Sequence, residues 1–266
     1  MRESILKELS PGHPWGEYLH YYDCIESTNT KARELAKAGA PGGTTLIADR
    51  QTGGRGRLGR SFHSPGGVGV YFTVILRPEC SATDLMHLTC AAAEAACDAV
   101  EQATGLRPGI KWTNDLVYGK RKLGGILTEL GLKPDGWVDY AIIGIGINCC
   151  QTETDFPEEI RTIAASLSMV TGKDVSRSRV AAALMESFSS LNKILLPGKE
   201  ELLTRYRADC ITLGQDISLV RSDGNVHHGK ALDIDSEGAL IVLRTDGCLE
   251  TVSSGEVSVR GMYGYL

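Results

Sequence analysis

The chain has 266 residues, of which 42% are hydrophobic and 23% are charged, and its formal net charge at pH 7 is −5. This length allows one large domain, or an ordinary domain with a small second one, and excludes three full domains. The composition excludes a disordered, collagen-like or coiled-coil protein. The acidic balance argues against broad binding to a phosphate backbone, which needs a basic surface, but it permits a local basic site.

The first half of the chain predicts alternating helices and strands. The segment from Ser27 to Gly39 is typical of a short helix with a polar cap, and Thr44 to Ala48 of a strand. Residues 68–76 alternate with apolar groups on both faces, which predicts a central strand covered on both sides. Three- and four-residue apolar steps over 81–101 then predict a helix about five turns long.

The following segments predict a hairpin, a further strand and three helices. Residues 110–118 and 122–130 flank Gly119-Lys120 and are typical of a hairpin, and 137–148 follows a Pro-Asp-Gly turn as a strand. Helical patterns come next, at about 158–170, 176–194 and 199–209.

After Cys210 the pattern changes to short β segments separated by Asp-Gly and Glu-Gly turns. They lie at 216–220, 229–234, 239–243, 249–252 and 257–260. This spacing predicts a small β-barrel of about 55 residues, so we divide the chain into domains 1–210 and 211–266. The second part carries four Lys or Arg against eight Asp or Glu, a balance that disfavours a reader of nucleic acid.

The cysteines and the N-terminal residues indicate in which cellular compartment the protein works. The eight cysteines contain no C-x-x-C pair, and Cys149 and Cys150 are adjacent, which suits neither a zinc site nor a secreted disulfide scaffold. The first twenty residues hold no apolar leader, and no segment approaches the roughly 20 apolar residues that span a bilayer. We therefore expect reduced thiols, a cytoplasmic protein and no membrane partner.

A glycine-rich segment follows the strand at Thr44. Gly54 to Gly59 reads G-R-G-R-L-G and matches the G-x-G-x-x-G pattern of dinucleotide-binding folds. The residues from Ser61 to Gly67 cannot open a helix, and no Asp or Glu between Arg50 and Pro78 is present to hold a ribose hydroxyl. The dinucleotide interpretation therefore fails on its context.

The arginines of this loop suggest a different chemistry. Residues 49–60 carry four arginines and one aspartate, a local charge of +3. Glycines let backbone N–H groups approach an oxyanion closely, and guanidinium groups supply paired hydrogen bonds, so the segment is typical of an anion site. Two alternatives stay open: a solvated glycine loop, and a groove for single-stranded nucleic acid that only Phe62 would stack in.

Two further segments carry polar residues. Residues 111–115 (K-W-T-N-D) and 122–125 (K-L-G-G) face each other across the predicted hairpin, so cations, an amide and one carboxylate converge. A salt-bridged surface with Trp112 as a packing residue is an equally good interpretation. For Ser27-Thr28-Asn29, the sequence alone favours helix capping over ligand contact.

Together these segments resemble the biotin protein ligases. The resemblance rests on E-S-T-N at 26–29, Q-x-x-G-R-G-R-L-G-R at 51–60, K-W-x-N-D at 111–115, R-K-L-G-G-I-L at 121–127 and G-I-G-I-N at 144–148. It implies an α+β fold with a mixed sheet and flanking helices, related to class II aminoacyl-tRNA synthetases and lipoate ligases, and a C-terminal SH3-like barrel. It also implies two steps: biotin and MgATP give biotinoyl-5'-AMP and pyrophosphate, and a lysine of a biotin carboxyl carrier domain then takes the biotinoyl group.

Given this resemblance, roles can be assigned to residues. Trp112 or strand glycines form an apolar wall for biotin, and polar side chains meet its ureido ring; we expect biotin to contact Ser27, Thr28, Asn29, Gln51, Arg55, Gly56, Arg57 and Lys122. The nucleotide is expected to contact Arg55, Lys111, Trp112, Asn114 and Asn148, with magnesium carried by ATP rather than by a fixed protein site.

Three residues are expected to be catalytic. Arg57 and Lys122 offset the repulsion between the biotin carboxylate and the α-phosphate and stabilise charge in the transition state. Asp115 orients or deprotonates the carrier lysine. The glycine- and arginine-rich loop is expected to order over the adenylate and exclude water.

The sequence differs from the biotin protein ligase pattern in two places. Thr113 stands where family members often have proline, and the 25 residues before Glu26 are too few for the helix-turn-helix domain of bifunctional members, so we expect a monofunctional ligase that does not bind DNA. The alternatives are a lipoate or octanoyl ligase or transferase, a biotin-binding regulator acting through DNA, and a plain nucleotide-binding module. Pairing of sheet edges would give a homodimer, which the composition does not decide.

Overall fold

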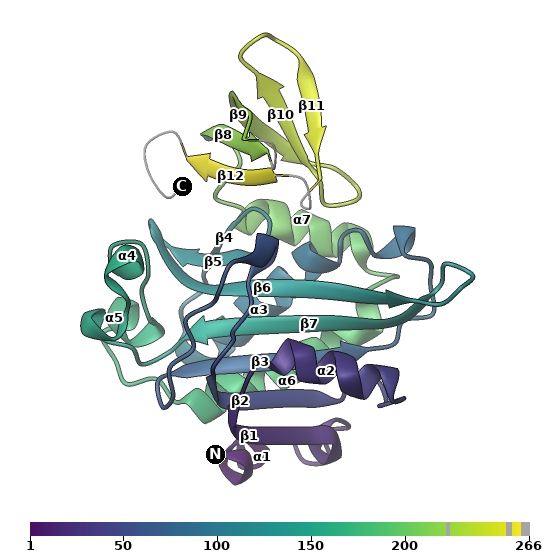
Figure 1. Cartoon of the computed structure of the whole chain (residues 1–266), viewed down its shortest axis with the longest axis vertical. Helices are drawn as coiled ribbons and strands as arrows, with labels where there is room; N and C mark the ends of the chain where they lie inside the picture. The colour runs from purple at the N-terminus through teal and green to yellow at the C-terminus, as the bar shows by residue number, and fades with distance from the viewer. Residues whose placement is uncertain (222–223, 254–256, 262–266) are drawn as a thin grey trace.

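Two β-sheets organise the computed structural model, which describes residues 1–221, 224–253 and 257–261 (Figure 1). The large sheet is built from β1 (Leu19–Ile25), β2 (Thr45–Gln51), β3 (Gly69–Leu76), β4 (Gly109–Lys111), β5 (Asp115–Tyr118), β6 (Arg121–Leu132) and β7 (Val138–Asn148). The small sheet is built from β8 (Asp216–Arg221), β9 (Val226–Ile234), β10 (Leu240–Arg244), β11 (Leu249–Val252) and β12 (Val257–Gly261).

The topology of the large sheet is mixed. Its strand order is β1-β2-β3-β7-β6-β5-β4, in which β1 and β2 run parallel and the other neighbours run antiparallel. The small sheet is antiparallel, in the order β11-β10-β9-β8-β12. The predicted α+β class, with a mixed sheet, flanking helices and a small C-terminal barrel, is confirmed, as is the central position of β3.

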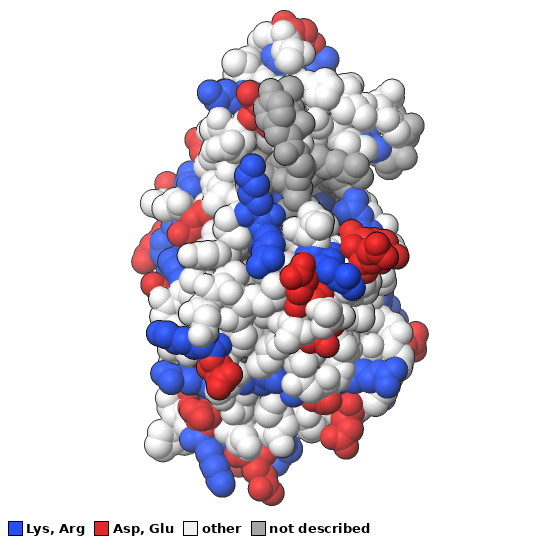
Figure 2. Space-filling view, turned by 90° about the vertical axis from the view of Figure 1, so that its left-hand side faces the viewer, with Lys and Arg blue, Asp and Glu red and all other residues white. Residues whose placement is uncertain are grey.

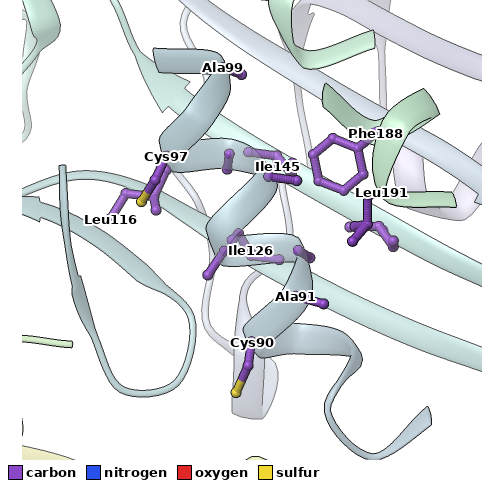
Figure 3. Packing of buried hydrophobic residues seen from close by; sticks show 14 of the residues in the cluster. Cys90, Ala91, Cys97, Ala99, Leu116, Ile126, Ile145, Phe188 and Leu191 are labelled. Atoms are coloured by element: carbon purple, nitrogen blue, oxygen red, sulfur yellow. The ribbon is translucent and has the colours of Figure 1, made fainter. Parts of the chain in front are cut away.

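Two long helices cover one face of the large sheet. They are α3 (Leu88–Thr104) and α6 (Arg177–Ile194). Figure 3 shows Cys97 of α3 beside Leu116 of β5, and Ile145 of β7 beside Phe188 of α6, within one buried cluster. The ring of Phe188 lies 5.7 Å from that of Phe72 on β3. The small side chains of α3 favour helix formation and let the helix approach the sheet closely, and Gly105 ends it with a φ of 76°.

The opposite face is only partly covered. Helix α2 (Thr28–Lys37) packs Ala32 and Ala36 against Ile75 and Ile142, in a small second cluster of buried side chains (Figure 1). Beyond α2 the strands carry glycine instead, and Gly125 of β6 pairs with Gly146 of β7. Because glycine has no side chain, this end of the face forms a depression next to α2.

The remaining helices are short or lie at the edges. They are α1 (Arg2–Glu8), α4 (Glu158–Arg161), α5 (Leu167–Thr171) and α7 (Lys199–Asp209). Figure 1 shows the small sheet above α7. The Arg207 guanidinium of α7 donates from Nε and Nη2 to the carbonyl oxygen of Ile234, at 3.0 and 2.7 Å, and Lys199 pairs with Glu237 at 2.9 Å. The two sheets are therefore tied through α7.

Some predicted elements differ from the structure. The predicted strand 110–118 is two strands, because the chain turns back at residues 112–114 and pairs Lys111 with Asp115. The helix predicted at 158–170 is also wrong. It is α4 and α5 with an extended segment between them, whose backbone bonds β6 instead: Lys122 N donates to Ile163 O at 2.7 Å and Ala165 N to Lys122 O at 2.9 Å.

Other differences concern boundaries. Helix α3 begins at Leu88 rather than residue 81, because a 3-10 turn over Thr83–Leu85 precedes it. Strand β1 was not predicted, since it is a polar edge strand without clean alternation. The chain passes from α7 beside β4, where Ile211 N donates to Ile110 O at 2.9 Å. The domain boundary at residues 210 and 211 and the homodimer stay predictions.

An ion-pair network joins α3 to α7. Arg107 binds Glu94, Asp98, Glu101 and Asp209 at 2.6 to 3.1 Å, and Arg205 also pairs with Glu94 and Asp98. Four carboxylates thus share two guanidinium groups. The Glu94 side chain has no exposed surface, and burial, followed by the charge of Asp209, raises its pKa to about 7.

Glu94 predicts a pH dependence of stability. Its pKa is about 7 in the folded chain and 4.5 ordinarily, so between these values the folded state binds more protons and its stability falls as pH rises. The substitution Glu94→Gln removes this titration. We expect the free energy of unfolding of Glu94→Gln, relative to the unmodified chain, to rise by about 2–3 kcal/mol from pH 4.5 to 7 in urea unfolding. A difference that does not change with pH would contradict this.

Candidate active site

A cavity of about 620 Å³ lies beside α2, on the glycine-bearing face of the large sheet. Strands, the glycine- and arginine-rich loop, and the segment around α4 line it together. The structure brings to it every residue that the sequence predicted for binding or catalysis: Ser27, Thr28, Asn29, Gln51, Arg55, Gly56, Arg57, Lys111, Trp112, Asn114, Asp115, Lys122 and Asn148.

The N-terminus of α2 forms one polar end of the cavity. Ser27 caps the helix, because its hydroxyl accepts from Thr30 N at 3.4 Å. The Thr28 backbone N–H and hydroxyl both donate to Gln51 Oε1, at 2.9 and 3.0 Å, and Gln51 Nε2 donates to Ser64 Oγ at 3.1 Å. Capping and cavity lining are therefore two properties of the same residues, rather than alternatives.

Asn29 is fixed from three sides. Its Oδ1 accepts from the Thr73 hydroxyl at 2.8 Å, and its Nδ2 donates to Glu129 Oε2 at 3.0 Å and to Leu127 O at 3.3 Å. Gly144 lies directly beneath, since a Cβ there would come within 1.8 Å of Asn29 Oδ1. Thr73 and Glu129 were not predicted from the sequence. The signal for Thr73 is a polar side chain in the fully buried strand β3.

The glycine- and arginine-rich loop folds back on itself over the cavity. Gly56 N donates to Arg60 O at 2.7 Å, and Phe62 N donates to Gly54 O at 2.9 Å. The Phe62 ring lies against Gly146, where a Cβ would be 2.4 Å from its Cε1. The segment is thus not a dinucleotide-type helix start, because only a short 3-10 turn, Arg57–Gly59, follows the glycines.

Arg57 is a partly satisfied cation on the cavity wall. Its Nη1 donates to Asn114 Oδ1 at 2.9 Å, while Nη2 is buried and has no hydrogen-bond partner. Burial lowers the pKa of the Arg57 guanidinium, and the charge of Asp115 opposes that shift. A buried, unpaired guanidinium N–H is costly, so this position favours an anionic ligand.

Lys122 and Asp115 form an ion pair, with Nζ and Oδ1 2.5 Å apart. Gly125 leaves room for it, since a Cβ there would be 3.2 Å from Lys122 Nζ. Asn148 also lines the cavity, and its amide is hydrogen-bonded within the protein. Its Nδ2 donates to Ala165 O at 3.1 Å, and its Oδ1 accepts from Gln151 Nε2 at 3.2 Å. One Oδ1 lone pair of Asn148 is left for a ligand.

Trp112 is held by the C-terminal part of the chain. Its backbone N–H donates to Thr212 Oγ1 at 2.9 Å, and its indole Nε1 donates to Gly238 O at 3.1 Å. The next peptide is fixed as well, because the Tyr206 hydroxyl donates to Thr113 O at 3.1 Å. Val259 of β12 also lines the cavity. Contact between the barrel and this site was not predicted from the sequence.

The surroundings of the site carry charges of both signs. Figure 2 shows Lys and Arg interspersed with Asp and Glu on the side of the molecule where α4 and α5 lie. Within residues 1–221, 224–253 and 257–261, no three His, Cys, Asp or Glu side chains are grouped as a metal site would require. In the same part of the chain, none of the helices has the length and apolar character to cross a membrane.

The chain is similar to known families and proteins that are described as biotin ligases. Residues 21–148 match the biotin/lipoate A/B protein ligase family and residues 212–260 match the biotin protein ligase C terminal domain. The chain is 37% identical over 240 residues to the bifunctional ligase/repressor BirA of Bacillus subtilis (strain 168), a match that covers 90% of this chain and 73% of that protein. It is 32% identical over 240 residues to the biotin--[acetyl-CoA-carboxylase] ligase of Paracoccus denitrificans, covering 89% and 98%.

A solved structure shares this architecture. The biotin protein ligase from Aquifex aeolicus in complex with biotin and ATP is similar to this chain with a TM-score of 0.77 and 31% sequence identity. The similarity covers 91% of this chain and 98% of that one.

The floor of the cavity generates a stability prediction. The change Gly144→Ala places a methyl group on Asn29, which Thr73 and Glu129 hold in place. We expect the free energy of unfolding to fall by about 3 kcal/mol in urea titration. As a control, Gly42→Ala brings its Cβ only to 3.5 Å from Arg77 N, so its effect should stay within about 0.5 kcal/mol. Equal stabilities for the two variants would mean that Asn29 is not held by this network.

Proposed function

The chain belongs to the biotin protein ligase family, and we propose that the cavity beside α2 is where it joins biotin to ATP and passes the biotinoyl group on. As a biotin protein ligase, it activates biotin with ATP to biotinoyl-5'-AMP and transfers biotin to a carboxylase. The observation that carries the site assignment is the buried, unpaired Nη2 of Arg57, in a cavity that also holds Lys122 and Asp115.

We place biotin at the α2 end of the cavity. The hydroxyls and amides of Ser27, Thr28 and Gln51 offer the donors and acceptors that a neutral ureido ring needs. Gly144 and Gly146 line the cavity and leave room for Asn29 and for the Phe62 ring, which offers an apolar surface to the ring system of biotin. The cavity volume lies within the range of about 300–1,000 Å³ that small-molecule sites span.

We place the nucleotide at the opposite end, between Trp112 and Asn114. The indole of Trp112 is buried and held by the barrel, so it presents a fixed apolar wall. Lys111 and Asn148 also line the cavity and supply polar groups for the ribose and phosphates. The half-exposed Arg55 lies on the α2 side of the cavity, because it pairs with Glu129. Magnesium arrives with ATP in this proposal.

In the first step, a biotin carboxylate oxygen bonds to the α-phosphorus as the bond to the pyrophosphate oxygen breaks. Both reactants are negative, so cations must offset their repulsion and the charge of the transition state. Arg57 has a donor in place with no other partner, and Lys122 contributes its ammonium while Asp115 orients it. These donors are fixed by the fold, which reduces the cost of reorganisation during the reaction.

In the second step, the ε-amine of the carrier lysine bonds to the acyl carbon and AMP leaves. At its ordinary pKa of about 10.4, only about one such amine in 2,500 is deprotonated at pH 7. Asp115 is the carboxylate on the cavity wall, so we assign it to orient the amine and accept its proton. Burial of the adenylate beneath the loop excludes the water that would hydrolyse it.

We further propose a biotin carboxyl carrier domain as the protein partner and the cytoplasm as the compartment. A relative named biotin--[acetyl-CoA-carboxylase] ligase supports the first. All eight cysteines are free thiols, which suits a reducing compartment and supports the second.

Substrate discrimination tests the proposed function. We expect pyrophosphate release with ATP, magnesium and biotin, and none above background with lipoate or octanoate, because the polar α2 end suits a ureido ring. Added carrier domain should then gain the mass of one biotinoyl group. Turnover with lipoate but not with biotin would assign the chain to the sister ligases, and no release with any acid would remove the proposal.

Measuring the two half-reactions separately tests whether Asp115 acts in the transfer step. The change Asp115→Asn leaves a side chain of the same shape but removes the proton acceptor, so transfer from preformed adenylate should slow by about 10²–10³-fold. Adenylate formation, followed as pyrophosphate release, should change by less than about tenfold, since Lys122 and Arg57 remain. As a control, Asp135→Asn alters a carboxylate at the β6–β7 turn, outside the cavity, and should leave both steps unchanged. Transfer at the unmodified rate in Asp115→Asn would contradict the assignment.

A further inference from the structure

Glu129 connects the two sides of the biotin end of the cavity. Its carboxylate accepts from Asn29 Nδ2 at 3.0 Å and from Arg55 Nη1 at 3.1 Å, and it also pairs with Arg33 of α2. Asn29 belongs to α2, and Arg55 belongs to the loop over the cavity. One carboxylate on β6 therefore holds a helix and a loop that come from distant parts of the chain.

Glu129 acts from behind the cavity wall. It is not among the cavity-lining residues, whereas Leu127, two positions earlier on the same face of β6, is. Its side chain is 22% exposed, so water only partly weakens its ion pairs. A residue in this place does not touch the substrate, but it fixes two residues, Asn29 and Arg55, that do line the site.

The loop also contacts the sheet and its turns at other points. Arg57 donates to Asn114 and Thr113, and the Phe62 ring lies against Gly146 and Tyr71. The Arg57 bonds lie at the proposed nucleotide end. At the biotin end, the Arg55–Glu129 ion pair ties the loop to β6.

We propose that Glu129 is a positioning residue that holds Arg55, and through it the loop of residues 54–62, closed over bound biotin and its adenylate. This inference rests on the proposed function, because it takes biotin as the occupant of the α2 end. Glu129 thereby controls how long the activated intermediate stays in the cavity.

A purely electrostatic role would have the opposite sign. The ligand is an anion, and Glu129 is a negative charge close to its site, so removing that charge would strengthen binding if only the field mattered. Removing a positioning carboxylate instead releases Arg55 and loosens the loop, which weakens retention. The direction of the change in release rate therefore decides between the two roles.

The test uses the full chain with Glu129→Gln, which keeps the shape and an acceptor for Asn29 but loses the charge that holds the guanidinium. Biotin release from the binary complex without ATP, and adenylate release during a chase with unlabelled biotin, should each become about tenfold faster. The KM for ATP should change less than about twofold. Glu34→Gln is the matched control, since Glu34 pairs with Lys31 on the exposed side of α2, and it should release both ligands at the unmodified rate.

A double-mutant comparison shows whether Glu129 acts through Arg55. If it does, Glu129→Gln adds little to the faster release already caused by Arg55→Gln, a change on the half-exposed loop that is tolerated by the fold. Additive effects, slower release or an unchanged rate in Glu129→Gln would overturn the inference. Pyrophosphate release by the unmodified chain tests the proposed function separately, and because biotin release is measured without ATP, the two failures are distinguishable.

Discussion

The site depends on one constraint in β7: the strand must be bulky on one face and bare on the other. Ile143, Ile145 and Ile147 are buried in the main core beneath α3, while Gly144 and Gly146 alternate with them on the cavity side. The period-2 geometry of a strand lets five consecutive residues serve both purposes. A side chain at either glycine would collide with Asn29 or Phe62, so neither α2 nor the loop could occupy its place.

The polar side chains at the α2 end of the cavity are buried and therefore need hydrogen-bond partners within the protein. Asn29 lies over Gly144, and Thr73 is the β3 residue paired with Gly144. Both are buried, and buried polar groups are stable only when hydrogen-bonded. Their hydrogen bonds join three elements, α2, β3 and β6. The resulting network fixes the α2 end of the cavity before any ligand arrives, which lowers the entropic cost of binding.

Residues whose role depends on neighbours close in the sequence were predicted correctly, and residues whose partners are far away in the sequence were missed. Contiguous motifs identified the cavity-lining residues, and the capping pattern at Ser27 placed α2 correctly. Glu129, Thr212 and Gly238 were missed, because their partners lie 74, 100 and 126 residues away. The fold of 110–118 was wrong for a related reason: apolar residues on both sides of the turn at 112–114 continue one pattern, although the chain reverses there. Local patterns record periodicity and caps, but not which distant backbone completes a hydrogen bond.

The same distant bonds make the barrel part of the site rather than an appendage. Trp112 is 4% exposed, and both of its N–H groups donate to acceptors beyond residue 210. Without those acceptors, two donors in an apolar setting would lose their partners, at a cost of about 1–3 kcal/mol each. The position of the indole at the proposed nucleotide end therefore depends in part on the contact between the small sheet and the rest of the chain, which Arg207 and Lys199 of α7 also support.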